Sequence, residues 1–471
     1  MKTKVISIIL LAAISAGMAA SCGAEGETAG TSAETDVSQE SVSDTQEPEK
    51  TYDFGGADFN VIGGNGAMIN FPYAEENGDV INDVLVARDR YIDETYNIKI
   101  RYNITESEEA CKTLTNSVLA GDNEYDMLAA TAIDAGKIAR KNVLYDILEM
   151  SGLTTDAPYW SRLVSENCRL NGKLYFLTGD ILPVIYTMPS CIFMNCYVAD
   201  KYGIGKDEVF KIVENGNWTI DKLIDYTKDT STDLNGDGVI KLADDFIGYA
   251  SLEGSLAAGV LAVGSGIKLC TENDDGKLTV DLLNDRVFGL IEKARVLFVD
   301  YKPDSFSGDN LHQALRENRF IFSQHYTSSA FTRYRDVETD YSILPIPKYD
   351  DTQGSYYSML NPWMYAFAAF PLYVDIEKAA VISEAMAMYS YENVRPVVYE
   401  DGFKLKGARD SKSAEMLDLI FDTVYLDNNA IYDFGGSMSI LSKALFLGRD
   451  LVSTYTSAEP RIEADIAKLY E

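Results

Sequence analysis

The sequence predicts an α/β protein with two lobes. The chain has 471 residues, which is too long for one small domain and suits two units that each bury a sizeable core. Between residues 58 and 131, strand-like and helix-like segments alternate, and this alternation favours a mainly parallel sheet covered by helices. Hydrophobic residues make up 46% of the chain and charged residues 24%, an ordinary globular composition.

The individual elements follow from hydrophobic spacing. Residues 58–64 form a short strand-like run, and residues 82–96 carry apolar side chains at helical spacing. Residues 97–103 alternate as a strand, 111–121 form a second helix that ends at a glycine, and 124–131 form a third strand. Strand-like runs and helices alternate again farther along the chain, at 171–204, 217–229, 282–350, 376–391 and 458–471.

The N-terminus predicts export. Lys2 and Lys4 precede an apolar stretch, residues 5–20, that is too short and too rich in small residues for a comfortable membrane span. The following AASC resembles the lipobox of bacterial lipoproteins, in which the cysteine is acylated; that cysteine would be Cys22, and Ala19 replaces the usual leucine. The alternative is an ordinary signal peptide whose removal leaves Cys22 without lipid.

Residues 23–50 predict a disordered tether. They are rich in Gly, Ser, Thr, Ala and carboxylates and contain no aromatic residue, so they cannot bury enough apolar surface to offset the entropy of ordering. The whole chain is also acidic, because 41 Lys and Arg stand against 73 Asp and Glu, giving a net charge of -32. This balance argues against nucleic acid as a partner. After Cys22, five cysteines remain, none in a zinc-binding spacing, and we expect buried free thiols.

The order of several segments resembles the extracellular solute-binding proteins of bacterial ABC importers, in the cluster that includes the maltose-binding protein. These segments are NDVLVARDRYIDETYNIKI, EYDML, NGKLYFLTGD with NCYVADKYGI, NWTIDKLIDYTKD with DLNGDG, and SILPIPKYDDTQGSYYSM. The resemblance implies a periplasmic-binding-protein-like fold of type II, with several hinge crossings between the lobes. The implied organisation is a signal peptide at 1–22, a tether at 23–50, one lobe at 51–185 and 360–400, and the other at 186–359 and 401–471.

The resemblance also implies a function. The protein would be a lipid-anchored monomer on the outer face of the cytoplasmic membrane, which captures a small solute between its lobes and delivers it to the permease subunits of the importer. An oligosaccharide is the expected solute, because sugar rings stack on aromatic side chains. The other possibilities are a surface glycan-binding or adhesion protein and a glycoside hydrolase. No GxSxG, HExxH or P-loop motif is present, so we expect no enzyme.

Four residues are candidates for the solute site. Trp160 and Trp363 lie near the implied hinge crossings, and the chain has only 3 Trp beside 30 Tyr and 19 Phe. Tyr326 and Asp134 occupy positions where the resemblance places an aromatic and a polar contact. Each of the four also has a plain alternative role as a packing residue.

Residues 233–244, DLNGDGVIKLAD, match a calcium-binding loop. Positions 1, 3, 5, 7 and 12 of such a loop supply oxygen ligands and position 6 is glycine; here the ligand positions hold Asp233, Asn235, Asp237, Val239 and Asp244. The alternative is a turn rich in Asp and Asn that binds no metal. Dockerins use two such loops, and no second copy is present, so we expect one structural Ca²⁺ away from the solute site.

Overall fold

The computed structural model describes residues 52–64, 71–72, 75–252, 254–273, 276–298, 308–364 and 366–470. The predicted signal peptide, the tether and Cys22 lie outside the described residues. From Tyr52 onward the chain clusters as a single unit by its internal contacts. All structural statements below concern the described part of this unit.

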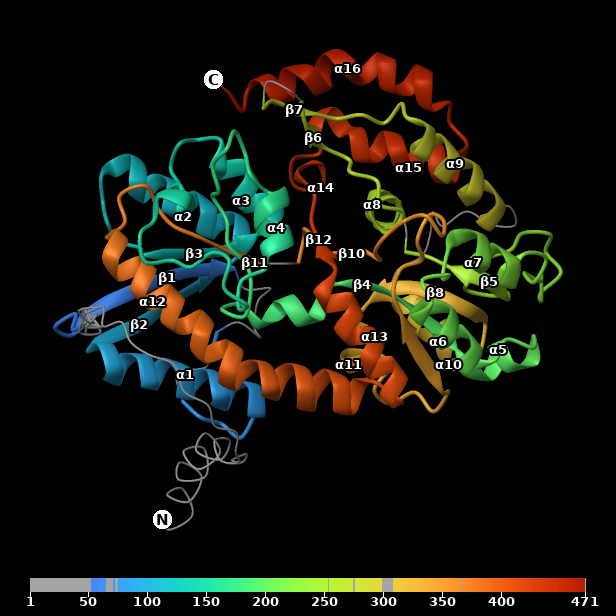
Figure 1. The fold of residues 1–471 in the computed structure, drawn as a ribbon, viewed down its shortest axis with the longest axis horizontal. Helices are drawn as coiled ribbons and strands as arrows, with labels where there is room; N and C mark the ends of the chain where they lie inside the picture. The colour runs from blue at the N-terminus through green and yellow to red at the C-terminus, as the bar shows by residue number, and fades with distance from the viewer. Residues whose placement is uncertain are drawn as a thin grey trace, which may run out of the picture. The chain divides into compact units, whose positions relative to one another are not determined.

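The first sheet forms from the N-terminal alternation and one strand from much later in the chain. Its strands lie in the order β11-β3-β1-β2, where β1 pairs in parallel with β2 and β3, and β11 runs antiparallel to β3. Helices α2 and α3 cover one face of this sheet and α1 and α12 cover the other (Figure 1). The strands are β1 Ala57–Gly64, β2 Ile98–Thr105, β3 Met127–Thr131 and β11 Ala366–Ala369; the helices are α1 Val80–Tyr96, α2 Ser107–Ala120, α3 Ala132–Ala139 and α12 Ile376–Tyr389.

The second sheet has the strand order β5-β8-β4-β9. Strand β4 runs antiparallel to both of its neighbours, and β5 is parallel to β8. In both sheets the antiparallel strand, β11 or β4, is the first strand after the chain arrives from the other sheet, and the other three strands run in one direction. The strands are β4 Ser190–Asn195, β5 Ile247–Ala250, β8 Phe320–Tyr326 and β9 Tyr341–Leu344.

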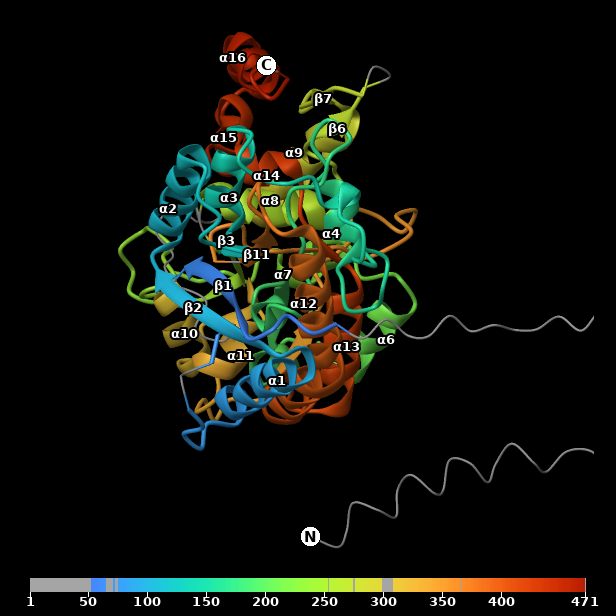
Figure 2. The same ribbon diagram turned by 90° about the vertical axis from the view of Figure 1, so that its left-hand side faces the viewer.

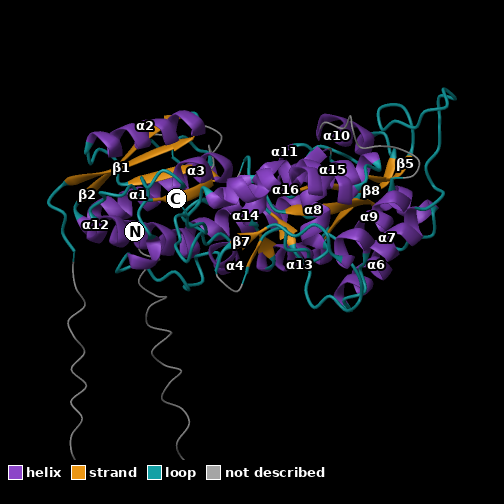
Figure 3. Cartoon of the chain, turned by 90° about the horizontal axis from the view of Figure 1, so that it is seen from above, coloured by secondary structure: helices purple, strands orange, loops and turns teal. Residues whose placement is uncertain are grey.

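Both faces of the second sheet are covered by helices, as the orange strands among purple helices in Figure 3 show. On one face Phe322 of β8 packs against Trp218, whose indole N–H donates to the Pro345 carbonyl at 2.9 Å, so Trp218 is a core residue. On the other face Phe193 of β4 meets Tyr334 edge to face. The associated helices are α5 Cys196–Lys201, α6 Lys206–Glu214, α7 Ile220–Thr227, α10 Gly308–Arg316, α11 Ser328–Thr332 and α13 Ser411–Asp422.

Four crossovers join the two sheets. The first is the 3₁₀ turn η3, Pro183–Thr187, which leads into β4. The second is β10, Ser358–Met359, which leads toward β11, and it pairs in parallel with the fourth, β12, Val424–Tyr425. The third is a wide π-type continuation of α12, η4 Ser390–Val394 and η5 Pro396–Gly407, which leads to α13.

Among the remaining elements, α8, α9 and α16 pack against α15 as a mainly helical layer, whereas α4 packs against β12 and α14 lies against α3 and α15. Helix α16 lies beside α15, with the short hairpin β6-β7 near them (Figure 2). The elements are α4 Arg162–Asn167, α8 Gly254–Gly264, α9 Asp285–Leu297, α14 Asn428–Tyr432, α15 Ser437–Leu447, α16 Leu451–Ala467, β6 Thr271–Glu272, β7 Leu278–Thr279, η2 Ile147–Glu149 and η6 Phe434–Gly436.

The predicted α/β class with mainly parallel sheets is confirmed. The cysteines Cys111, Cys168, Cys191, Cys196 and Cys270 form no disulfide with one another. Cys111, Cys168 and Cys191 are buried as expected, whereas Cys196 and Cys270 are only partly buried. Among the helices in the described ranges, none combines the length and apolar character needed to cross a membrane. The division into lobes at 51–185 with 360–400 and 186–359 with 401–471 remains a prediction.

Candidate functional site

The carboxyl end of the first sheet brings two of the predicted site residues to one edge. Strand β3 ends at Thr131, whose hydroxyl accepts from the Asp134 backbone N–H and so caps helix α3. Ala366, the first residue of β11, lies opposite Thr131. The segment before β11 therefore reaches the same edge, and the Ile133 N–H donates to the Pro362 carbonyl at 3.4 Å. Asp134 and Trp363 thus flank one end of β3.

These two side chains differ in their freedom to bind a solute. The Asp134 carboxylate accepts from the Lys137 ammonium at 2.8 Å and from the Thr131 hydroxyl at 3.0 Å. Burial alone would raise the pKa of Asp134, but these hydrogen bonds and the Lys137 charge lower it. Trp363 is 63% exposed, which is unusual for so large an apolar ring. Trp363 is therefore the better candidate for stacking on a solute.

The carboxyl end of the second sheet meets the crossovers. Tyr326 ends β8, and the next residue, Thr327, donates its N–H to the Pro189 carbonyl and its hydroxyl to the Tyr186 carbonyl, each at 3.0 Å. Pro189 in turn pairs with Leu360 of the second crossover. Leu360 precedes Trp363 by three residues, a span of at most about 11 Å. The carboxyl edges of both sheets therefore lie close to the Pro189–Leu360 pairing.

Buried polar atoms without partners gather at this pairing. Tyr326 is buried and lies opposite Ser190 in the sheet register, and neither hydroxyl makes a hydrogen bond to any described residue. The hydroxyl of Ser358, two residues before Leu360, is buried and equally without a partner. Because buried hydroxyls are almost always hydrogen-bonded, unsatisfied hydroxyls on three segments that adjoin this pairing indicate room for water or for a polar ligand.

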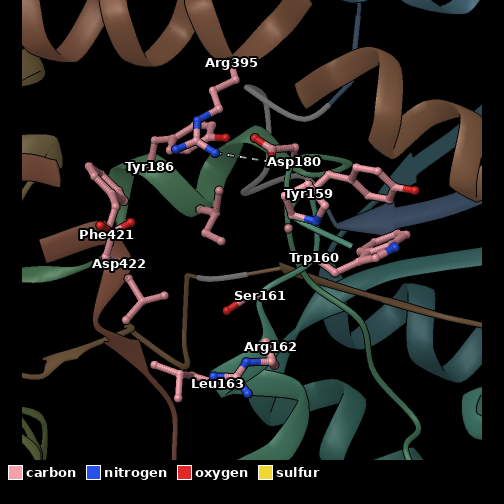
Figure 4. Close-up of a pocket in the computed structure, with 14 residues that line it drawn as sticks. Tyr159, Trp160, Ser161, Arg162, Leu163, Asp180, Tyr186, Arg395, Phe421 and Asp422 are labelled. Atoms are coloured by element: carbon pink, nitrogen blue, oxygen red, sulfur yellow. Dashed lines mark ion pairs between the residues drawn. The ribbon is translucent and has the colours of Figure 1, made fainter. Parts of the chain in front are cut away.

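A cavity of about 280 Å³ adjoins this region (Figure 4). Its connection to the sheet edge is Tyr186, which lines the cavity and whose carbonyl binds Thr327. Three of the four crossovers contribute to its walls. The lining residues are Pro158, Tyr159, Trp160, Ser161, Arg162, Leu163, Gly179, Asp180, Ile185, Tyr186, Arg395, Phe421, Asp422 and Val424.

Trp160 is among the residues that line this cavity, but its ring points away from Tyr186 and Phe421 (Figure 4). The indole N–H donates to the Glu384 carboxylate of α12 at 3.2 Å, and the Tyr159 hydroxyl donates to the same carboxylate. Trp160 is only 4% exposed. Its backbone borders the cavity while its ring holds the loop against α12.

Asp180 is the most deeply buried Asp or Arg side chain of the cavity lining. Its side chain is 5% exposed, one oxygen lies 4.0 Å from the Arg395 guanidinium, and the other oxygen, Oδ1, makes no hydrogen bond to any described residue. Burial raises the pKa of Asp180 to about 7, which the Arg395 charge only partly offsets. The neighbouring Gly179 has no room for a side chain, because a Cβ there would collide with the Tyr159 carbonyl. Glycine thus permits the close backbone contact that buries Asp180.

Aromatic rings form the wall on the opposite side from Trp160. Tyr186 stacks on Tyr399 with ring centroids 5.3 Å apart and meets Phe421 edge to face at 5.5 Å. The Arg395 guanidinium lies near the rings of Tyr186, Tyr391 and Tyr399, at 5.9, 5.3 and 5.7 Å from their centroids. This packing fixes the direction of the Arg395 side chain toward Asp180.

Sequence reasoning missed Asp180, Arg395, Tyr186 and Phe421. Asp180 follows a strand-like run and a glycine in LYFLTGD, which is a recognisable signal for a polar group at a strand end. Arg395 and Phe421 carry no such signal, because Phe421 belongs to an ordinary helical pattern and Arg395 follows the π-type turn η4. The four predicted residues do not share one cavity: Trp160 lines it, whereas Asp134, Tyr326 and Trp363 are not among the lining residues.

Asp side chains close the turns of residues 233–244, an arrangement that the metal-free alternative also predicts. The Asp233 carboxylate accepts from the N–H groups of Gly236 and Gly238, at 2.6 and 2.8 Å, and the Asp237 carboxylate accepts from the Val239 N–H at 2.8 Å. The carboxylate that closes the loop is the buried Asp245, which accepts from Leu234 and Lys241.

The candidate ligands of this loop are oxygen atoms of the kind that calcium prefers. They come from Asp233, Asn235, Asp237 and the Val239 carbonyl, whereas the twelfth position, Asp244, is exposed. Across the described ranges no group of three or more His, Cys, Asp or Glu side chains is arranged to hold a metal ion. The calcium site therefore remains a prediction.

Comparison with known proteins gives matches at the level of structure. No family profile matches the sequence, and no curated protein matches it significantly. The fold matches 526 solved chains. One is the cyclic alpha-maltosyl-1,6-maltose binding protein of Arthrobacter globiformis, with 13% identity, coverage of 88% of this chain and 99% of that chain, and a TM-score of 0.59.

Two further structures agree with this match. The maltose-binding periplasmic protein MalE of Listeria monocytogenes, in complex with maltose, has 14% identity, covers 88% of this chain and 98% of its own, and gives a TM-score of 0.57. An ABC transporter solute-binding protein of Thermotoga lettingae, bound with alpha-D-tagatose, has 16% identity, coverage of 87% and 100%, and a TM-score of 0.54. The chain therefore has the fold of the ABC-transporter solute-binding proteins.

Proposed function

We propose that this chain is the solute-binding subunit of an ABC importer and captures a small sugar, most naturally an oligosaccharide, between its two sheets. The observation that carries the proposal is the meeting of both carboxyl sheet edges at the Pro189–Leu360 pairing, within a fold shared with solute-binding proteins. In open α/β sheets, ligands bind outside the carboxyl ends of the strands. The solved proteins with this fold include several crystallised with sugars.

The chemistry of this region suits a sugar. Trp363 offers an exposed flat ring for the C–H face of a sugar, and Tyr186 and Phe421 offer aromatic surface inside the cavity. The unpartnered hydroxyls of Tyr326, Ser190 and Ser358 can exchange hydrogen bonds with solute hydroxyls.

Binding would act by shifting a hinge equilibrium. A solute that touches both sheet edges binds the closed arrangement better than the open one and so populates it. The crossovers at η3, β10, η4-η5 and β12 are the segments about which such a movement would turn. No covalent step is required, which agrees with a binding protein rather than an enzyme.

The proposal extends to location and partners. A lipid on Cys22 would anchor the protein to the outer face of the cytoplasmic membrane, where it would act as a monomer and deliver its solute to permease subunits. Calcium in the loop at Asp233, Asn235 and Asp237 would stiffen a surface excursion that contributes no residue to the cavity lining. Mass spectrometry of the mature protein would test the acylation directly.

A thermal-shift screen tests the solute class. The purified body from Tyr52 is mixed with maltose, maltotetraose, cellobiose, xylobiose and D-tagatose, and with spermidine and a tripeptide as non-sugars. We expect at least one sugar to raise the melting temperature, with binding confirmed by titration calorimetry. If only spermidine or the peptide stabilises the protein, the sugar proposal is wrong.

A further inference from the structure

Asp180 presents an acceptor that nothing in the described protein satisfies. Its backbone N–H donates to the Tyr159 carbonyl at 2.9 Å, which holds the residue at the cavity wall. Its Oδ1 atom is buried and makes no hydrogen bond to any described residue. A buried carboxylate oxygen without a donor is costly, so a ligand that supplies an O–H or N–H at this point would be strongly favoured.

Arg395 presents the matching donors. Its guanidinium lies 4.0 Å from the second Asp180 oxygen, beyond the length of an ordinary N–H···O hydrogen bond. It is 31% exposed and forms no hydrogen bond to another side chain or backbone group in the described ranges. The surrounding tyrosine rings restrict its side chain without using its N–H groups. An acceptor and a set of donors thus stand side by side at the cavity wall.

The charge of the cavity indicates a neutral ligand. The lining holds two carboxyl groups, on Asp180 and Asp422, and two guanidinium groups, on Arg162 and Arg395. Burial raises the pKa of Asp180 to about 7, so this carboxyl is partly protonated near pH 7. Neither sign of charge is in large excess, so the lining does not favour a strongly charged ligand. A hydroxyl group both donates and accepts, so two hydroxyls on adjacent carbons can satisfy Asp180 and Arg395 together.

The size of the cavity sets a second limit. At about 280 Å³ it lies just below the range of about 300 to 1,000 Å³ that is typical of small-molecule sites. It suits one terminal unit of a sugar, with the apolar face of the ring against Tyr186 or Phe421. The rest of a longer solute would extend toward the sheet edges.

We infer that Asp180 and Arg395 together select the solute by binding two adjacent hydroxyl groups of a neutral sugar unit in this cavity. Asp180 Oδ1 accepts from one hydroxyl, and the Arg395 guanidinium donates to the oxygen of the next. This inference rests on the proposed function and adds to it the residues that determine specificity.

Calorimetry on four variants tests the pair. The probe is whichever of maltose, maltotetraose, cellobiose, xylobiose or D-tagatose binds the wild-type protein. Asp180→Asn and Arg395→Gln should each weaken binding about 10- to 100-fold, the range for a lost hydrogen bond to a charged group. Arg395→Lys keeps the charge and should restore part of the loss. Asp156→Asn changes an exposed carboxylate outside the cavity lining and should leave affinity unchanged.

A deoxy sugar separates a direct contact from a structural effect. A set of single-deoxy analogues of the same sugar should include one that binds the wild-type protein at least 10-fold more weakly than the parent sugar does. The same analogue should bind Asp180→Asn almost as tightly as the parent sugar binds this variant. The inference is wrong, although the proposed function stands, if Asp180→Asn binds the parent sugar as tightly as the wild type does. It is also wrong if removing each hydroxyl lowers the affinity of the sugar for both proteins by the same factor. If no sugar binds the wild-type protein, the proposed function fails and this inference fails with it.

Discussion

Asp180 should make the stability of the protein depend on pH in a measurable way. In the unfolded chain its carboxyl has a pKa near 3.8, and burial in the cavity raises it to about 7. The folded protein therefore holds this proton more tightly than the unfolded chain does. The stabilisation from this group is fully present below pH 3.8 and is lost as pH rises through about 7.

The size of the effect follows from the gap between the two values. Each pKa unit corresponds to about 1.4 kcal/mol, so the free energy of unfolding should fall by roughly 2 kcal/mol between pH 5 and pH 7 through Asp180 alone. Asp427 is also buried, and its pKa is raised to about 6, so it adds a similar slope over part of the range. Asp180→Asn removes only the first contribution.

The measurement is urea unfolding of the wild type and Asp180→Asn at pH 5, 6, 7 and 8, followed by intrinsic fluorescence. The difference in unfolding free energy between the two proteins should change by about 2 kcal/mol from pH 5 to pH 7 and then become constant. The unfolding free energy of Asp156→Asn should vary with pH in the same way as that of the wild type. Parallel curves for Asp180→Asn as well would show that Asp180 is not buried as the cavity geometry requires.

Three other changes test separate parts of the structure. Trp363→Ala should weaken sugar binding about 10-fold and change the unfolding free energy by less than about 0.5 kcal/mol, because the ring is exposed. The control is Tyr373→Ala, which removes an exposed aromatic ring beyond the other end of β11 and should leave sugar affinity unaltered. If both variants lose the same amount of sugar affinity, Trp363 does not stack on the sugar. Glu384→Gln should lower the unfolding free energy by about 1–3 kcal/mol in urea titrations, since its carboxylate accepts from the Tyr159 and Trp160 side chains; no loss would mean that these bonds are not formed in solution. EDTA should lower the melting temperature of the wild-type protein, and added calcium should restore it. Asp237→Ala should abolish this response. If EDTA does not change the melting temperature of the wild-type protein, the calcium site is ruled out.

The fold was predictable because its signals are local. Hydrophobic spacing identified β1, α1, β2, α2 and β3, and the alternation of strands with helices indicated their parallel arrangement. The juxtaposition of Asp134 and Trp363 needed more than local signals, because it depends on the antiparallel pairing of β11 with β3.

The cavity was less predictable than the fold. Trp160 was predicted to contact the solute because it lies near an implied hinge crossing, whereas the hydrogen bond to Glu384 that turns its ring away depends on a helix far along the chain. Asp180 and Arg395 lie close together because η4 and η5 continue the chain from α12 past the first crossover. A helical pattern reports which face is apolar, whereas the partner of one arginine is decided by tertiary packing.

The late arrival of β11 constrains how the protein can be made and divided. Until residues 366–369 have been synthesised, β3 lacks its antiparallel neighbour, and its backbone N–H and C=O groups remain open to pairing with other chains. A fragment that ends before Ala366 should therefore aggregate rather than fold as an independent half. For the same reason the first sheet cannot finish forming while the chain is still emerging, so folding should be slow and largely post-synthetic.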